Sequence, residues 1–192
     1  FSWQLRANEG YQATELEGSA LAGVESDVDT DGKFGLIAHG WRSFTDPQRL
    51  TRELAQHFTR LGGEILNAEV SRIENTRSKP RLLHFTDGSQ RDVSKLVIAA
   101  GCWAGQLLKD IGINIPLAPL HGYHTDIADS GVSLSRPVLY ASGGFVNTPV
   151  ETGLRIAGTV EIAPLDAKPN FRRAEILVKK AQRSLFPGLK HT

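Results

Sequence analysis

The feature that most constrains the fold is an unbroken apolar run at residues 96–100, of sequence LVIAA, followed by Gly101. The run has the length of a strand and lacks the alternation of a strand with one solvated face, so it predicts a central strand covered on both sides. Trp103, Leu107 and Leu108 follow at helical spacing and predict a helix after a glycine turn. Such a unit directs free backbone N–H groups above the edge of a sheet, where they suit a phosphate group. A glycine placed there only for packing is the alternative.

Composition and charge exclude several classes of partner and site. The 192 residues are 40% hydrophobic and 22% charged, enough for one large or two small domains with a core. A net charge of +1 without a basic cluster argues against nucleic acid and anionic membrane as partners. The single cysteine, Cys102, excludes an internal disulfide and a cysteine-based zinc site, and it fits a reducing compartment such as the cytoplasm. No apolar run approaches the roughly 18 residues of a membrane span, so we expect no transmembrane segment.

Glycine and proline mark the ends of the predicted elements in the first half of the chain. A helix begins at a capping box formed by Thr45 and Gln48, carries an apolar stripe and ends at Gly62. Residues 64–73 then predict a strand. A helix that crosses between strands implies that the strands are parallel. We therefore expect this strand to lie near the one at residues 96–100 and parallel to it.

The second half of the chain has a different character. The first half closes with a predicted hairpin around the Asp87-Gly88 turn and with the apolar run. From residue 112 onward, prolines separate short β-type segments. This pattern predicts an antiparallel sheet and not further strand–helix alternation. A last helix is predicted from about residue 170 to 185, with one broad apolar face.

Several short motifs occur between residues 34 and 189 in a characteristic order. They include VIAAGCW at residues 97–103, IPL at 115–117, HGY at 121–123 and GLRIAGTVE at 153–161, followed by the helix that ends at Phe186-Pro187. In order and spacing they resemble the FAD-dependent D-amino-acid oxidase and dehydrogenase family. Within that family the bacterial D-amino-acid dehydrogenases are the most similar.

The resemblance implies a fold of class α+β (α/β), with a partial FAD-binding Rossmann-like layer and an antiparallel or mixed substrate-binding sheet flanked by helices. Residues 1–40 then belong to a substrate domain, residues 41–111 to a partial FAD-binding domain, and residues 112–192 to the substrate-binding β-sheet domain with its helix. The opening Gly-x-Gly-x-x-Gly and closing Gly-Leu-Arg-Pro segments of the family do not occur in this sequence. We therefore expect an internal fragment that neither holds FAD tightly nor turns over by itself.

The resemblance also assigns cofactor-side residues. The family's small-residue turn, which lets the backbone of the cofactor lie against bare peptide, falls on Ala99, Ala100 and Gly101, and an aromatic beside it falls on Trp103. Val70 falls at the position where a strand of the family contacts the adenine of FAD through its backbone. A valine that only fills the core is an equally good interpretation of this position.

On the substrate side, the resemblance places Tyr123, Phe145 and Arg155 on strands that face the flavin. Phe145 lies near a position where relatives have a tyrosine that binds the substrate carboxylate, a bond that a phenyl ring cannot donate. Arg155 could hold a carboxylate, but a structural salt bridge, for example with Glu161, is the favoured interpretation. The sequence predicts no metal site and no protein acid, base or nucleophile.

The implied activity is oxidation of the CH–NH2 group of D-amino acids to oxo acids, by hydride transfer to FAD. A related enzyme acting on glycine, sarcosine or a proline derivative is an alternative, as is a non-catalytic binding domain that has lost its cofactor motifs. The expected partner is a small amino acid or amine. The electron acceptor is left open between oxygen and a quinone, and a quinone acceptor would associate a cytoplasmic protein with the membrane.

Overall fold

The computed structural model describes residues 2–74 and 81–191. The chain divides into two compact units, which we describe separately. The first contains Phe1–Thr51, Gly122–Glu161 and Lys168–Thr192, and the second contains Arg52–His121 and Ile162–Ala167. The main boundaries between the units therefore lie after residues 51 and 121. Each is about ten residues beyond the expected boundary, at 40/41 and at 111/112. Residues 41–51 group with the first unit, and residues 112–121 group with the second.

The first unit opens with a small layer. It contains helix α1 (Ser2–Asn8), strand β1 (Ala13–Glu17), helix α2 (Gly18–Val24) and strand β2 (Phe34–Ala38). The two strands pair antiparallel, with Ala13 opposite Ala38. The buried carboxylate of Glu25 then accepts hydrogen bonds from the backbone N–H of Ser135 and from Arg136 Nε, at 3.0 and 3.1 Å. These bonds fasten the loop after α2 to the loop before β7.

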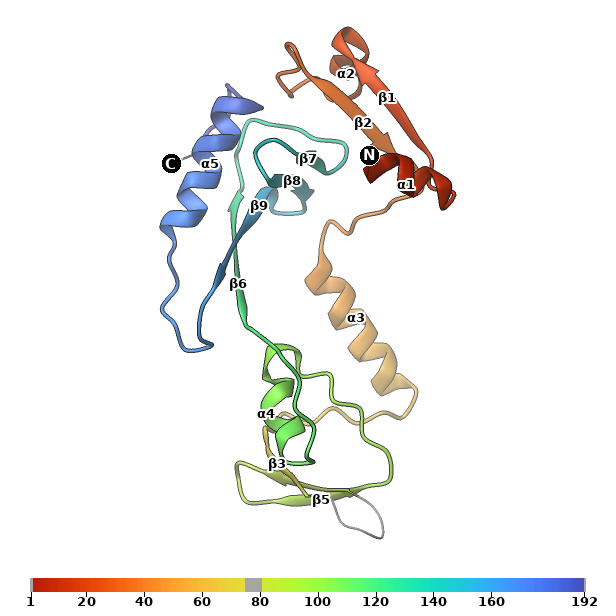
Figure 1. The fold of residues 1–192 in the computed structure, drawn as a ribbon, viewed down its shortest axis with the longest axis vertical. Coiled ribbons are helices and arrows are strands. Elements are labelled where there is room, and N and C mark those ends of the chain that lie inside the picture. Colours follow the sequence, from red (N-terminus) through yellow and green to blue (C-terminus); the bar gives the residue numbers. More distant parts are fainter. Residues whose placement is uncertain (1, 75–80, 192) are drawn as a thin grey trace. The chain divides into compact units, whose positions relative to one another are not determined.

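The main sheet of the first unit has four strands in the order β6-β9-β8-β7. They are β6 (Leu120–Ile127), β7 (Val138–Tyr140), β8 (Phe145–Val150) and β9 (Gly153–Ile162). Strands β7, β8 and β9 pair antiparallel, as the proline-separated segments predict. Helix α5 (Arg172–Ser184) packs on one face of this sheet (Figure 1).

The core of the first unit lies between α5 and the sheet. Buried α5 residues recur at helical spacing and meet side chains of β8 and β9, which alternate between the two faces of the sheet. Burying each large apolar side chain stabilises the unit by roughly 2 kcal/mol before entropy is counted. The members of this core are Leu134, Phe145, Leu154, Ile156, Leu177, Val178, Ala181, Leu185, Phe186 and Leu189.

Helix α3 (Pro47–Arg60) follows the predicted bounds but differs in its cap. The Asp46 carboxylate accepts a hydrogen bond from the Arg49 backbone N–H at 2.8 Å, so Asp46 caps the helix in place of Thr45. The apolar stripe is exposed: Leu54 is 60% and Phe58 is 50% accessible, and no residue of α3 is buried.

The second unit contains an antiparallel sheet of β3 (Val70–Glu74), β4 (Arg81–Phe85) and β5 (Gln90–Val93). The β4–β5 pair is the predicted hairpin around Asp87-Gly88. After β5 come a 3-10 turn, η1 (Gly101–Trp103), and helix α4 (Ala104–Lys109). Asp110 accepts a hydrogen bond from the Ile73 backbone N–H at 3.1 Å, which ties the end of α4 to β3.

The prediction of a central strand at residues 96–100 is wrong. These residues form no strand, Val97 is 86% exposed, and β3 pairs with β4 instead of lying parallel to the run. A strand requires neighbours that satisfy its backbone N–H and C=O groups, and the described residues supply none here. The glycine turn and the helix after the run do form, as the sequence predicts.

Candidate functional site

The cofactor-side residues predicted from the sequence lie together in the second unit. Ala99 and Gly101 are exposed, and Ala100 is half-buried directly before the η1 turn. Gly101 has φ of +55°, and a Cβ added there would have no heavy atom within 4 Å. The backbone of Gly101 is therefore bare on the side where a side chain would project.

Trp103 ends the η1 turn, where its backbone N–H donates to the Ala100 carbonyl at 3.1 Å. Its side chain is 58% exposed, an unusual degree for an indole ring in a folded unit. The small residues at 99–101 and this exposed ring together form an open surface rather than a packed corner. Such a surface fits a flat, extended ligand that approaches the peptide closely.

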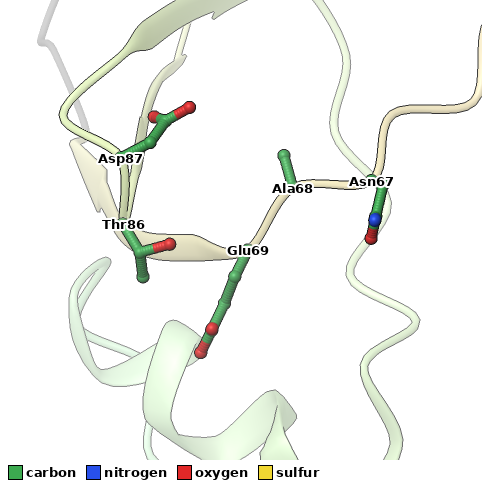
Figure 2. Close-up of a pocket in the computed structure, with 5 residues that line it drawn as sticks. All are labelled: Asn67, Ala68, Glu69, Thr86 and Asp87. Carbon is green, nitrogen blue, oxygen red and sulfur yellow. The ribbon is translucent and has the colours of Figure 1, made fainter.

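Val70 is half-buried at the start of β3, opposite Phe85. A pocket of about 360 Å³ lies immediately before it, and Figure 2 shows its lining from two segments. The Thr86 backbone N–H donates to the Glu69 carbonyl at 3.0 Å and joins these segments. The pocket is lined by Asn67, Ala68, Glu69, Thr86 and Asp87.

The carboxylates of this pocket do not form a charged centre. Glu69 and Asp87 point in different directions from the two segments (Figure 2). Asp87 accepts hydrogen bonds from the Ser89 hydroxyl and backbone N–H, at 2.6 and 2.9 Å, and these bonds hold the pKa of its carboxyl below the usual value. In the part of the chain that the structure describes, no three acidic, histidine or cysteine side chains gather as metal ligands.

Tyr123 lies in β6 of the first unit and is buried, with 7% of its surface exposed. Its hydroxyl donates to Glu161 Oε2 at 2.7 Å and accepts from the Asn170 backbone N–H at 2.9 Å. The hydroxyl thereby links β6, β9 and the segment that leads into α5. This position differs from the exposed one expected of a substrate contact, and the assignment of Tyr123 to substrate binding stays a prediction.

Phe145 is a core residue with 1% exposure. Its ring stands edge-on to Tyr140, with centroids 5.5 Å apart, and packs on the α5 side of the sheet. Alternation along β8 turns the Phe145 ring toward α5, whereas the sequence prediction placed Phe145 on a strand that faces the flavin. Its role in substrate binding stays a prediction.

Arg155 forms the structural salt bridge predicted from the sequence, but its partner is Asp126 and not Glu161. Arg155 Nε and Nη2 each donate to Asp126 at 2.7 Å, one bond to each carboxylate oxygen. These bonds lower the pKa of Asp126 and raise that of Arg155. Glu161 instead accepts from Tyr123 and lies 3.5 Å from Arg173 Nε.

Two histidines have carboxylate neighbours that their sequence spacing did not indicate. His84 Nε2 lies 3.0 Å from Glu74 Oε2, across the β3–β4 pair. His124 Nε2 lies 4.0 Å from Asp126 Oδ1, beside the Arg155 pair. Asp126 was absent from the predicted site because its partner, Arg155, is 29 residues away in sequence, and only the pairing of β6 with β9 brings the two together.

Known proteins of one family are similar to this chain over most of its length. The model of the FAD dependent oxidoreductase (DAO) family matches residues 2–192. A D-amino-acid oxidase from Bradyrhizobium diazoefficiens is 30% identical over 187 residues, which cover 97% of this chain and 44% of that protein. A glycine oxidase from Bacillus licheniformis is 27% identical over 75% of this chain and 38% of that protein.

Solved structures have the same fold. The crystal structure of glycine oxidase from Geobacillus kaustophilus matches with a TM-score of 0.72 and 18% identity, over 94% of this chain and 48% of that one. The chain therefore spans less than half the length of these relatives. No helix in the described ranges has both the length and the apolar character needed to cross a bilayer. The expected class of helices and antiparallel sheets is confirmed, and the chain belongs to the DAO family of FAD-dependent oxidoreductases.

Proposed function

We propose that this chain is part of an FAD-dependent enzyme that oxidises the CH–NH2 group of D-amino acids to oxo acids. The observation that carries the proposal is the 30% identity with a D-amino-acid oxidase over 97% of the chain. The cytoplasm is the proposed compartment, which agrees with the single cysteine, Cys102.

The open turn at residues 99–101 fits the cofactor. FAD, when bound, supplies the group that accepts the hydride from the substrate Cα–H. We propose that Ala99, Ala100 and Gly101 let it lie against bare backbone, with Trp103 beside it and Val70 offering backbone to the adenine. The bare peptide at Gly101 supports this assignment, because a larger side chain there would occupy the open space.

We further propose that the protein's role in the reaction is positioning. Arg155 is the predicted substrate residue with an accessible charged group, since its side chain is 33% exposed. Tyr123 and Phe145 are buried residues of β6 and β8, the strands on either side of β9, and we keep their assignment to substrate binding as a proposal. Because the sequence lacks the Gly-x-Gly-x-x-Gly segment, the chain alone is expected to bind FAD weakly and to be inactive.

A second candidate is an oxidase of glycine, sarcosine or a proline derivative. It is supported by the 27% identity with a glycine oxidase over 75% of the chain. A non-catalytic binding domain is the third candidate.

Reduction of bound flavin separates these candidates. Protein expressed from the full open reading frame is mixed anaerobically with D-alanine, L-alanine, glycine, sarcosine and proline, and flavin absorbance is followed. Preferential bleaching by D-alanine supports the first candidate, whereas preference for glycine, sarcosine or proline supports the second. A flavin that no amine reduces, or the lack of any bound flavin, contradicts both enzyme candidates. Repeating the reaction with oxygen or a quinone then identifies the electron acceptor.

A further inference from the structure

The side of α5 that faces away from the sheet gathers cationic side chains that are separated in the sequence. The buried residues of α5 contact the sheet, and an exposed stripe recurs on the opposite side of the helix at intervals of four, three and four residues. This stripe runs about 16 Å along the helix axis. We call it, with the neighbouring Lys180, the α5 outer face, and its exposed members are Arg172, Ile176, Lys179, Lys180 and Arg183.

The cations of the α5 outer face have no partners within the described residues. None of the four forms an ion pair or a side-chain hydrogen bond there. Glu175 is the one acidic residue of α5 and precedes Lys179 by four residues, a spacing that favours an ion pair, but the two side chains form none. In contrast, the half-buried Arg173 has Nε 3.5 Å from Glu161. The outer face is therefore strongly positive, and its charges are available to an external partner.

The stability of the helix does not explain this arrangement. The helix dipole favours cations in the last turn, where Arg183 lies, but disfavours them in the first turn, where Arg172 lies. Lys179 and Arg183 are four residues apart, a spacing at which like charges repel each other. An anionic partner outside the chain accounts for four cations on one side of this helix, because it would turn each of these repulsions into an attraction.

Exposed apolar side chains lie among the cations and indicate the class of partner. Ile176 is 45% exposed in the middle of the stripe, and Phe171 is 68% exposed directly before the helix. At an anionic bilayer, cations meet lipid phosphates while apolar side chains enter the boundary between head groups and acyl chains. A nucleic acid duplex also supplies phosphates, but its backbone offers no apolar layer. The combination therefore favours a lipid surface.

We propose that the α5 outer face docks the protein on an anionic lipid bilayer, with its four cations on lipid phosphates and Ile176 between the head groups. This inference goes beyond the proposed function and does not depend on the reaction. It revises the sequence-based argument against anionic membranes, which used the net charge of +1 and the lack of a basic cluster. The cations come together only when the helix forms, because they are spaced along one of its faces.

Cosedimentation with vesicles tests this proposal. Protein expressed from the full open reading frame is mixed with vesicles of phosphatidylcholine, alone or with an increasing proportion of phosphatidylglycerol. Binding should rise with the proportion of phosphatidylglycerol and should be lost at high salt, which screens the charges. Equal binding to both kinds of vesicle, or binding to neither, overturns the proposal.

Variants of exposed residues show whether α5 is the surface involved. Each cation is expected to contribute about fivefold to the affinity, so K179Q/R183Q should weaken binding to the anionic vesicles roughly 25-fold. R52Q/K109Q is the matched control, because it removes the same charge from exposed cations of the second unit that also have no partner in the described ranges. Circular dichroism verifies that both variants are folded. If K179Q/R183Q binds the vesicles as R52Q/K109Q does, the proposal is wrong.

A DNA duplex distinguishes a lipid surface from a general site for polyanions. The wild type and I176S are titrated with anionic vesicles and with a short fluorescent duplex at the same salt concentration. I176S should weaken vesicle binding about fivefold, because an apolar side chain no longer enters the bilayer, and should leave any duplex binding unchanged. Duplex binding as tight as vesicle binding, or an I176S variant that binds the vesicles as the wild type does, contradicts docking on lipid.

Discussion

Replacement of Gly158 with alanine should destabilise the first unit strongly. Gly158 lies in β9 with φ of +151°, and a Cβ added there would come 2.5 Å from the Phe145 Cα and 2.6 Å from the Gly144 carbonyl oxygen. Both atoms belong to backbone, so no flexible side chain can move aside. Strands β8 and β9 would have to separate at the point where Phe145 enters the core.

The expected cost can be worked from these contacts. Overpacking of this kind costs about 2 kcal/mol, and alanine at an unfavourable backbone angle adds about 1 kcal/mol. A loss of about 3 kcal/mol in the free energy of unfolding lowers the Tm of a chain of this size by about 9 °C.

Urea unfolding followed by circular dichroism measures this loss. The matched control is G122A, because Gly122 is also a strand residue, in β6, but a Cβ added there would have no heavy atom within 4 Å. G122A should change stability by less than about 0.5 kcal/mol. If G158A unfolds at the same urea concentration as G122A, the close packing of β8 against β9 described here is wrong.

Three further predictions concern the cores and the charged groups. L177A should cost about 3 kcal/mol in urea unfolding, because Leu177 is 4% exposed between α5 and the sheet; a cost below about 1 kcal/mol would contradict that packing. D110N should cost about 1 kcal/mol and speed hydrogen exchange of the Ile73 amide, which loses a charged acceptor; unchanged exchange would argue against this link. D126N should flatten the acid side of the stability profile. The lowered pKa of Asp126 means that its carboxylate stabilises the fold above the unfolded-state pKa, near 3.8, and that this contribution is lost as the pH falls through the folded-state pKa. Urea midpoints between pH 6 and pH 3 measure the effect, and identical profiles for the wild type and D126N would contradict it.

Local patterns in the sequence predicted the local elements well. The bounds of α3 follow from Pro47 and Gly62, the β4–β5 hairpin follows from Asp87-Gly88, and α5 follows from its apolar spacing. Each of these signals acts over a few residues, so the sequence carries them directly.

Features that depend on distant partners were predicted less well. The run at residues 96–100 has strand composition, but strand formation requires neighbours, and Val97 is 86% exposed. The partner of Arg155 is Asp126 because β6 lies beside β9, a pairing that spacing alone does not reveal. Phe145 is buried because α5 covers its face of the sheet. In each case the outcome depends on tertiary packing that a single sequence does not specify.

The central claim is that the bare turn at Gly101 accommodates FAD, and flavin content tests it most directly. Protein from the full open reading frame is purified as wild type, G101V and G112V, and FAD per chain is measured by absorbance. Gly112 is the matched control, because it lies in the same unit, has φ of +77° against +55° for Gly101, and is equally open. Both variants carry the same backbone strain, but only valine at position 101 would occupy the proposed cofactor surface. The account predicts that G101V loses FAD while G112V retains it. Equal FAD content in G101V and G112V would contradict the account.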